Sequence, residues 1–163
     1  MDDARARLFA GADKILVNTP ALHNPSIIDQ LAAEFGSQCV VLGVDSRVIE
    51  GAWRVHQYTG DPDKTVIGHR RTLDWIAEGV DRGAGEVVLE CMDLYGVGDG
   101  YDVEDLRAAR GVWSAPLIAS GGARQKEHFK SVFELAKVDG ALAASVFHKG
   151  VIEIGQLKAW LGG

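Results

Sequence analysis

The sequence has no long apolar run, few cysteines and no excess of positive charge. A membrane-spanning helix needs about 20 consecutive apolar residues, and no segment approaches that length, so no membrane partner is expected. The two cysteines, Cys39 and Cys91, lie at or inside apolar runs, which suits buried thiols rather than a disulfide framework. The amino terminus also lacks an apolar segment of signal-peptide length. We therefore expect a cytoplasmic protein.

The charge balance and the histidine spacing exclude further classes of function. Seventeen basic residues stand against twenty-three acidic ones, for a net charge of −6, whereas nucleic-acid binding requires a basic surface. The basic cluster at residues 69–71 is expected on a solvated loop, and nucleic acid is not expected as a partner. The five histidines show no metal-ligand spacing, and the glycines at 96–100 lack the dinucleotide-binding pattern. Neither a metal nor a cofactor is expected.

Short apolar runs alternate with segments of helical spacing along the chain. The expected strands cover residues 14–18, 39–44, 86–89, 116–119 and 140–143, and the expected helices cover residues 5–9, 27–35, 73–80, 103–112, 126–136 and 154–161. This alternation predicts an α/β fold with a parallel sheet covered by helices, in a single domain over residues 1–163. The runs KILV and VVL lack polar alternation, which predicts strands buried on both faces. Residues 46–60 break the rhythm around Glu50-Gly51 and predict an inserted hairpin.

The residues after the expected strands are the first candidates for a binding site, because parallel β/α folds bind ligands at the carboxyl ends of their strands. Small residues follow two of these strands, at 120–122 and 144–145. Such residues leave backbone N–H groups open to an anion, so the two turns together predict a phosphate cradle. The alternative is that Gly121-Gly122 only forms a tight turn.

Asp45 is the best acid–base candidate in the sequence. It ends a wholly apolar strand, and partial burial of this kind suits a carboxylate to proton transfer. The alternative is a helix cap or a loop ion pair, which spacing alone favours.

Four segments closely resemble the cyclase subunit of imidazole glycerol phosphate synthase: GADKILVNTPALHNPSIIDQLAAEFGSQCVV, RGAGEVVLECMDLYGVGDGYD, PLIASGGA followed by EHF, and DGALAASVFH. The resemblance extends from about residue 5 to the end of the chain. It implies a (β/α)8 barrel enzyme of histidine biosynthesis. Such enzymes take ammonia from a glutaminase partner and convert a phosphorylated ribulosyl intermediate into imidazole glycerol phosphate and an aminoimidazole carboxamide ribotide.

The resemblance also implies roles for individual residues. Asp45 matches a catalytic aspartate on the family's fifth strand. The positions that match the two phosphate sites are Asn18 and Thr19 for one, and Gly96, Gly122, Ala144 and Ser145 for the other, with Ser120 and Gly121 close by. Lys14 and Glu86 match members of a charged ring where ammonia enters, and the alternative for this pair is a stabilising ion pair.

The chain departs from the family pattern in two ways. The resemblance begins at the third helix, so the first three strands and a second catalytic aspartate have no counterpart here. Leu94-Tyr95, Glu90 and Arg124 stand where the family has other residues, and a glutamate that faces a phosphate site repels its ligand unless it is protonated or turned away.

These departures leave three hypotheses. About five strands form only a partial barrel, whose open apolar face predicts a homodimer or higher oligomer in which two copies of Asp45 share one site. Alternatively, the chain is a non-catalytic phosphate-binding or structural half-barrel module. In the third hypothesis, it complements a separate amino-terminal fragment.

Overall fold

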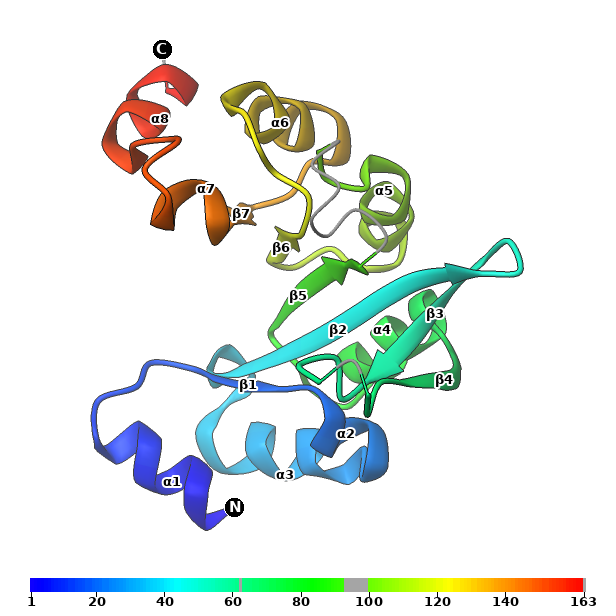
Figure 1. Cartoon of the computed structure of the whole chain (residues 1–163). Helices are drawn as coiled ribbons and strands as arrows, with labels where there is room; N and C mark the ends of the chain where they lie inside the picture. Colours follow the sequence, from blue (N-terminus) through cyan, green and yellow to red (C-terminus); the bar gives the residue numbers. More distant parts are fainter. Residues whose placement is uncertain (62, 93–99, 163) are drawn as a thin grey trace.

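The computed structural model describes residues 1–61, 63–92 and 100–162, and its strands and helices alternate as the sequence predicts (Figure 1). The strands are β1 (Ile15–Val17), β2 (Val40–Ile49), β3 (Ala52–Gln57), β4 (Val66–Arg71), β5 (Glu86–Cys91), β6 (Leu117–Ser120) and β7 (Gly140–Leu142). The helices are α1 (Asp2–Phe9), α2 (Thr19–His23), α3 (Ser26–Phe35), α4 (Thr72–Asp81), α5 (Val103–Val112), α6 (Lys126–Ser131), α7 (Ser145–His148) and α8 (Ile154–Leu161). A 3-10 turn (Ser37–Cys39) precedes β2, and a π-helical turn (Val132–Ala136) extends α6.

The sheet is mostly parallel and confirms the predicted α/β class. Strand β1 pairs parallel to β2, β2 to β5, β5 to β6 and β6 to β7. These five strands follow one another in chain order with helices between them, which is the arrangement of part of a (β/α)8 barrel. The antiparallel strands β3 and β4 extend the sheet beyond β2.

The two faces of the sheet are buried to different extents along the strands. The run KILV alternates between exposed and buried residues, which corrects the prediction for that strand, whereas Val40, Val41 and Leu42 are all buried, as predicted for both faces of β2. Leu42 and Val44 on β2 and Leu89 on β5 are fully buried. This face packs against the helices, because Leu42 contacts the position of Gly79 in α4 so closely that no Cβ would fit there. On the opposite face the side chain of Leu16 lies against Gly43, and Leu16 is 54% exposed. Within the described residues, helices cover one face and leave the other partly open.

The inserted hairpin is confirmed, although its strands run further than expected. Glu50 and Gly51 both have positive φ, 51° and 76°, as a two-residue hairpin turn requires. Strand β2 does not end at Asp45 but continues to Ile49, where its antiparallel partner is β3. The prediction of a loop for the basic cluster at 69–71 is wrong, because these residues belong to β4, which pairs with the free edge of β3.

Two short helices occupy segments for which the sequence predicts no helix. Helix α2 fills the expected loop around Pro20, and proline is well tolerated in the first turn of a helix, where its missing N–H is not needed. Helix α7 directly follows β7. No helix within the described ranges is long and apolar enough to cross a membrane.

Candidate functional site

A row of polar side chains crosses the sheet at the carboxyl ends of its parallel strands. Asp45 on β2 is the register partner of Glu90 on β5, and Glu90 is in turn the partner of Ser120 on β6. Register partners on adjacent strands point to the same face. The fold therefore brings Asp45, Glu90 and Ser120 side by side, although 75 residues separate the first from the last (120 − 45).

Asp45 is half-buried and accepts hydrogen bonds from two other segments of the chain. Asn18, directly after β1, donates from Nδ2 to Asp45 Oδ2 over 3.0 Å, and the hydroxyl of Thr59, after β3, donates to the same oxygen. Two donors aimed at one carboxylate oxygen stabilise its negative charge. The alternatives of a helix cap or a loop ion pair for Asp45 find no support among the described contacts.

Thr19 lies next to this cluster. Its hydroxyl accepts a hydrogen bond from the backbone N–H of Tyr58 over 3.3 Å, which ties the start of α2 to the segment after the hairpin. Sequence reasoning missed Thr59. The predicted hairpin could have indicated Thr59, because a hairpin that starts beside Asp45 returns the residues after its second strand to the neighbourhood of Asp45.

A second group of predicted residues lines a cavity of about 680 Å³ at the same edge of the sheet. The predicted positions among its lining residues are Ser120, Gly121, Gly122, Ala144 and Ser145. Gly121 and Gly122 have φ values of 94° and 96°, a conformation that side-chain-bearing residues rarely adopt. Arg124 and Lys149 also line the cavity and bring positive charge to it, and His148 is a further lining residue. Such a lining suits an anionic ligand.

The structure separates the predicted residues into two places. Within the described part of the chain, Asn18, Thr19 and Asp45 are not among the residues that line the cavity, and Glu90 lies between them and it. Gly96, together with the departures Leu94 and Tyr95, lies outside the described residues.

Glu90 belongs to the site, although the sequence marked it only as a departure from the family pattern. It lines the cavity, and one of its carboxylate oxygens accepts a hydrogen bond from the Ser120 hydroxyl. Burial raises the pKa of the Glu90 carboxyl, the hydrogen bond from Ser120 opposes that shift, and the neighbouring Asp45 adds to it. The resemblance suggests that Glu90 faces a phosphate site, and the register of β5 places it between Asp45 and Ser120. Register cannot be read from residue types.

Lys14 and Glu86 form an ion pair at the opposite end of the strands. Lys14 directly precedes β1 and Glu86 begins β5, and the Glu86 side chain is mostly buried while that of Lys14 is about half exposed. The two residues are thus brought together across 72 positions of sequence, away from Asp45 and the cavity.

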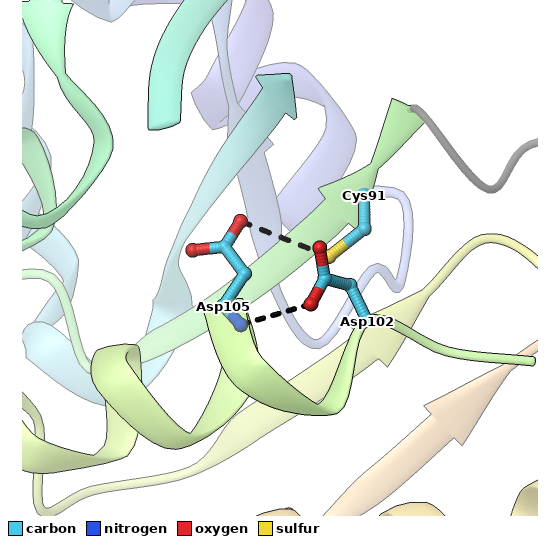
Figure 2. Close-up of side chains that lie close together, drawn as sticks. All are labelled: Cys91, Asp102 and Asp105. Atoms are coloured by element: carbon cyan, nitrogen blue, oxygen red, sulfur yellow. Dashed lines mark hydrogen bonds between the residues drawn. The ribbon is translucent and has the colours of Figure 1, made fainter. Parts of the chain in front are cut away.

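Cys91, Asp102 and Asp105 form a buried cluster on the helix side of β5 (Figure 2). Their ligand-type atoms lie within 4.8 Å of one another. The Cys91 thiol donates to Asp105 Oδ2 over 3.9 Å, and the backbone N–H of Asp105 donates to Asp102 Oδ1 over 3.0 Å, so that Asp102 caps α5. Burial, with the neighbouring carboxylates, raises the pKa of Cys91 well above its ordinary value. A cysteine binds a metal ion as its thiolate, and a raised pKa disfavours that form. The cluster therefore fits a role in capping the start of α5 better than a metal site.

Comparison with known proteins gives consistent matches. The model of the family described as "Histidine biosynthesis protein" matches residues 1–153. The chain is 83% identical over its full 163 residues to imidazole glycerol phosphate synthase subunit HisF of Maricaulis maris (strain MCS10). It is 58% identical, again over its full length, to the same subunit of Stenotrophomonas maltophilia (strain K279a). The chain spans 64% of the length of each of these two relatives.

Proposed function

Because this chain belongs to the histidine biosynthesis protein family, we propose that it catalyses the cyclase reaction of imidazole glycerol phosphate synthase. In this reaction ammonia and a phosphorylated ribulosyl intermediate yield imidazole glycerol phosphate and an aminoimidazole carboxamide ribotide. The observation that carries the proposal is that Asp45 and a cavity suited to an anion lie at the same edge of the sheet, at the carboxyl ends of the parallel strands, with Glu90 between them. Ligands bind at this edge in barrel enzymes.

Asp45 is the proposed acid–base residue. It lies on the open face of the sheet, half-buried, with one oxygen fixed by Asn18 and Thr59. A carboxylate held in this way keeps one orientation towards a bound substrate while its second oxygen stays available for a proton.

The proposed substrate carries phosphate, and the residues on either side of Glu90 suit two phosphate positions. Asn18 and Thr19 lie beside Asp45. The second proposed position is the cavity, which is lined by Ser120, Gly121, Gly122, Ala144 and Ser145. A substrate with a phosphate at each position would span the open face and pass over Asp45 and Glu90. Gly96 completes the second position in this proposal.

We also propose that ammonia enters at the end of the strands where Lys14 and Glu86 lie. An ion pair there, at the opposite end of the strands from the cavity, suits a charged entrance. A glutaminase that supplies the ammonia would bind against this end. A purely stabilising ion pair is the alternative, and exchanging the two charges tests it because a stabilising pair survives the exchange.

The open face of the sheet further supports self-association, in a homodimer or higher oligomer. Leu16 and Leu142 are 54% and 47% exposed, and both belong to the face that carries Asp45 and Glu90. Exposed leucines on a sheet face favour a contact that removes them from water.

The test of the proposed reaction is ammonia-dependent turnover of the purified protein, prepared from a host that lacks its own cyclase. Asp45→Asn is expected to lower turnover on the order of 100-fold or more, because it removes the proposed acid–base group. Asp81→Asn, an exposed aspartate at the end of α4, is the matched control and should retain full turnover. Equal turnover of Asp45→Asn and the original protein would contradict the proposal.

A further inference from the structure

Glu90 occupies an unusual position for a carboxylate, because it sits directly on the turn proposed to bind phosphate. One of its oxygens accepts the hydrogen bond from Ser120, the first residue of that turn. Its other oxygen, Oε1, lies 3.2 Å from where a Cβ on Gly121 would be. The carboxyl thus accepts a hydrogen bond from the first residue of the turn and lies beside the position that a side chain on the second would occupy, and its side chain lines the same cavity.

A charged carboxylate at this place and a bound phosphate exclude each other electrostatically. Two negative charges close together near a protein surface repel each other. Protonation removes that repulsion and turns the same group into a hydrogen-bond donor for the ligand. The alternative is that the carboxylate turns away from the ligand, but the hydrogen bond from Ser120 holds the carboxyl at the turn.

We propose that Glu90 takes up a proton when an anion binds at the turn of Ser120–Gly122, so that Glu90 makes phosphate binding at this site tighter as the pH falls. The proposal rests on the proposed function for the existence of the phosphate site. It adds that the protonation of Glu90 determines how anion affinity at the cavity, the second proposed phosphate position, changes with pH.

The surroundings of Glu90 support this linkage. Burial raises the pKa of the carboxyl before any ligand arrives, and Asp45 next to it in the sheet adds to the shift, against the opposing hydrogen bond from Ser120. A bound anion adds a further negative charge and raises the pKa again. The carboxyl is neutral below its pKa, and anion affinity is therefore expected to rise as the pH falls through that value.

Other titratable or charged groups interact electrostatically with Glu90 or share its cavity: Asp45 on the same face of the sheet, Cys91 on the helix side of β5, Tyr101, and the cavity residues Arg124, His148 and Lys149. Burial raises the pKa of Cys91 and of Tyr101, which keeps both neutral around pH 7. Protonation of His148 would also strengthen anion binding, so the experiment must separate His148 from Glu90.

The experiment is calorimetric titration of the protein with sulfate, which keeps its two charges between pH 5 and pH 8, in buffers of different ionisation enthalpy. We compare the original protein with Glu90→Gln, which has the same shape and no charge, and with His148→Gln. The original protein is expected to take up as much as one proton per sulfate. Between pH 5 and pH 8 the sulfate affinity of the original protein should fall by a factor about 10 times larger than the fall for Glu90→Gln. His148→Gln should retain this extra pH dependence.

Each outcome decides the matter. Equal affinity and equal proton uptake by the original protein and Glu90→Gln would overturn the inference, and the test at Asp45 would still stand for the reaction. Failure of every variant to bind sulfate at any pH would overturn both this inference and the second phosphate position. Tighter binding by Glu90→Gln at pH 8, with the difference vanishing towards pH 5, supports the proton linkage.

Discussion

At the scale of single residues, the orientation of Asp45 depends on a hydroxyl that the sequence did not single out. Thr59 donates to the carboxylate from the segment after the hairpin. Thr59→Val keeps the shape of the side chain and removes this donor. A hydrogen bond to a charged group contributes about 1.5–3 kcal/mol, so we expect cyclase turnover to fall about 10-fold. The change should appear in kcat more than in KM, because Thr59 orients the acid–base group.

Thr65→Val is the matched control for this variant. Thr65 lies in the same connection, and its hydroxyl donates to the carbonyl of Asp61 over 3.1 Å instead of to Asp45. Its turnover should stay within twofold of the original protein. A similar loss in both variants would mean that the loop, rather than the hydrogen bond to Asp45, is responsible.

At the scale of elements, Asp139 joins three parts of the fold just before β7. Its Oδ2 accepts from the backbone N–H of Leu117 at 2.9 Å and from Arg110 Nη2 at 2.5 Å. The N–H of Leu117 lowers the pKa of Asp139, burial opposes the shift, and Arg110 lowers the pKa further. The carboxylate is therefore stabilised in the folded protein. Since the side chain is 54% exposed, we expect Asp139→Asn to cost only about 1 kcal/mol of unfolding free energy at neutral pH.

The sign of the pH dependence follows from the lowered pKa. A carboxylate whose pKa is depressed by folding adds stability above its unfolded pKa of about 4, and this stability is lost as the pH falls through the folded value. Urea unfolding at pH 7 and at pH 2.5 checks this. The difference in unfolding free energy between the original protein and Asp139→Asn should become smaller at the lower pH. The exposed Asp13→Asn is the control. An equal difference in unfolding free energy at both pH values would contradict the stabilising role of the Asp139 charge.

At the scale of the whole molecule, the open sheet face is the expected surface of self-association. Leu16→Glu places a charge on that face and should shift the protein towards the monomer in sedimentation velocity. Leu135→Glu is the matched control, because Leu135 is 55% exposed, against 54% for Leu16, and lies in the π-helical turn rather than on the sheet. Equal sedimentation of the original protein and Leu16→Glu would contradict association through this face.

Much of the fold could be predicted because its signals are local. Helix α5 has the predicted bounds, Val103–Val112, since acidic residues in its first turn and apolar spacing mark it within ten residues. The hairpin turn could be predicted from Glu50-Gly51 for the same reason. Strand β4 could not, because the only partner of Val66–Arg71 within the described residues is the edge of β3, and that edge exists only once the hairpin has folded.

The sequence by itself determined the alternation of strands and helices, the small-residue turns and the residues that resemble a known family, because composition and spacing carry these directly. Only the tertiary structure decided which side chains meet. Asp45, Glu90 and Ser120 form one row because parallel strands pair in a single register, and a shift of one residue would turn Glu90 to the helix side. Register also places Glu90 beside Ser120 and Asp45, where burial and the neighbouring Asp45 raise the pKa of its carboxyl.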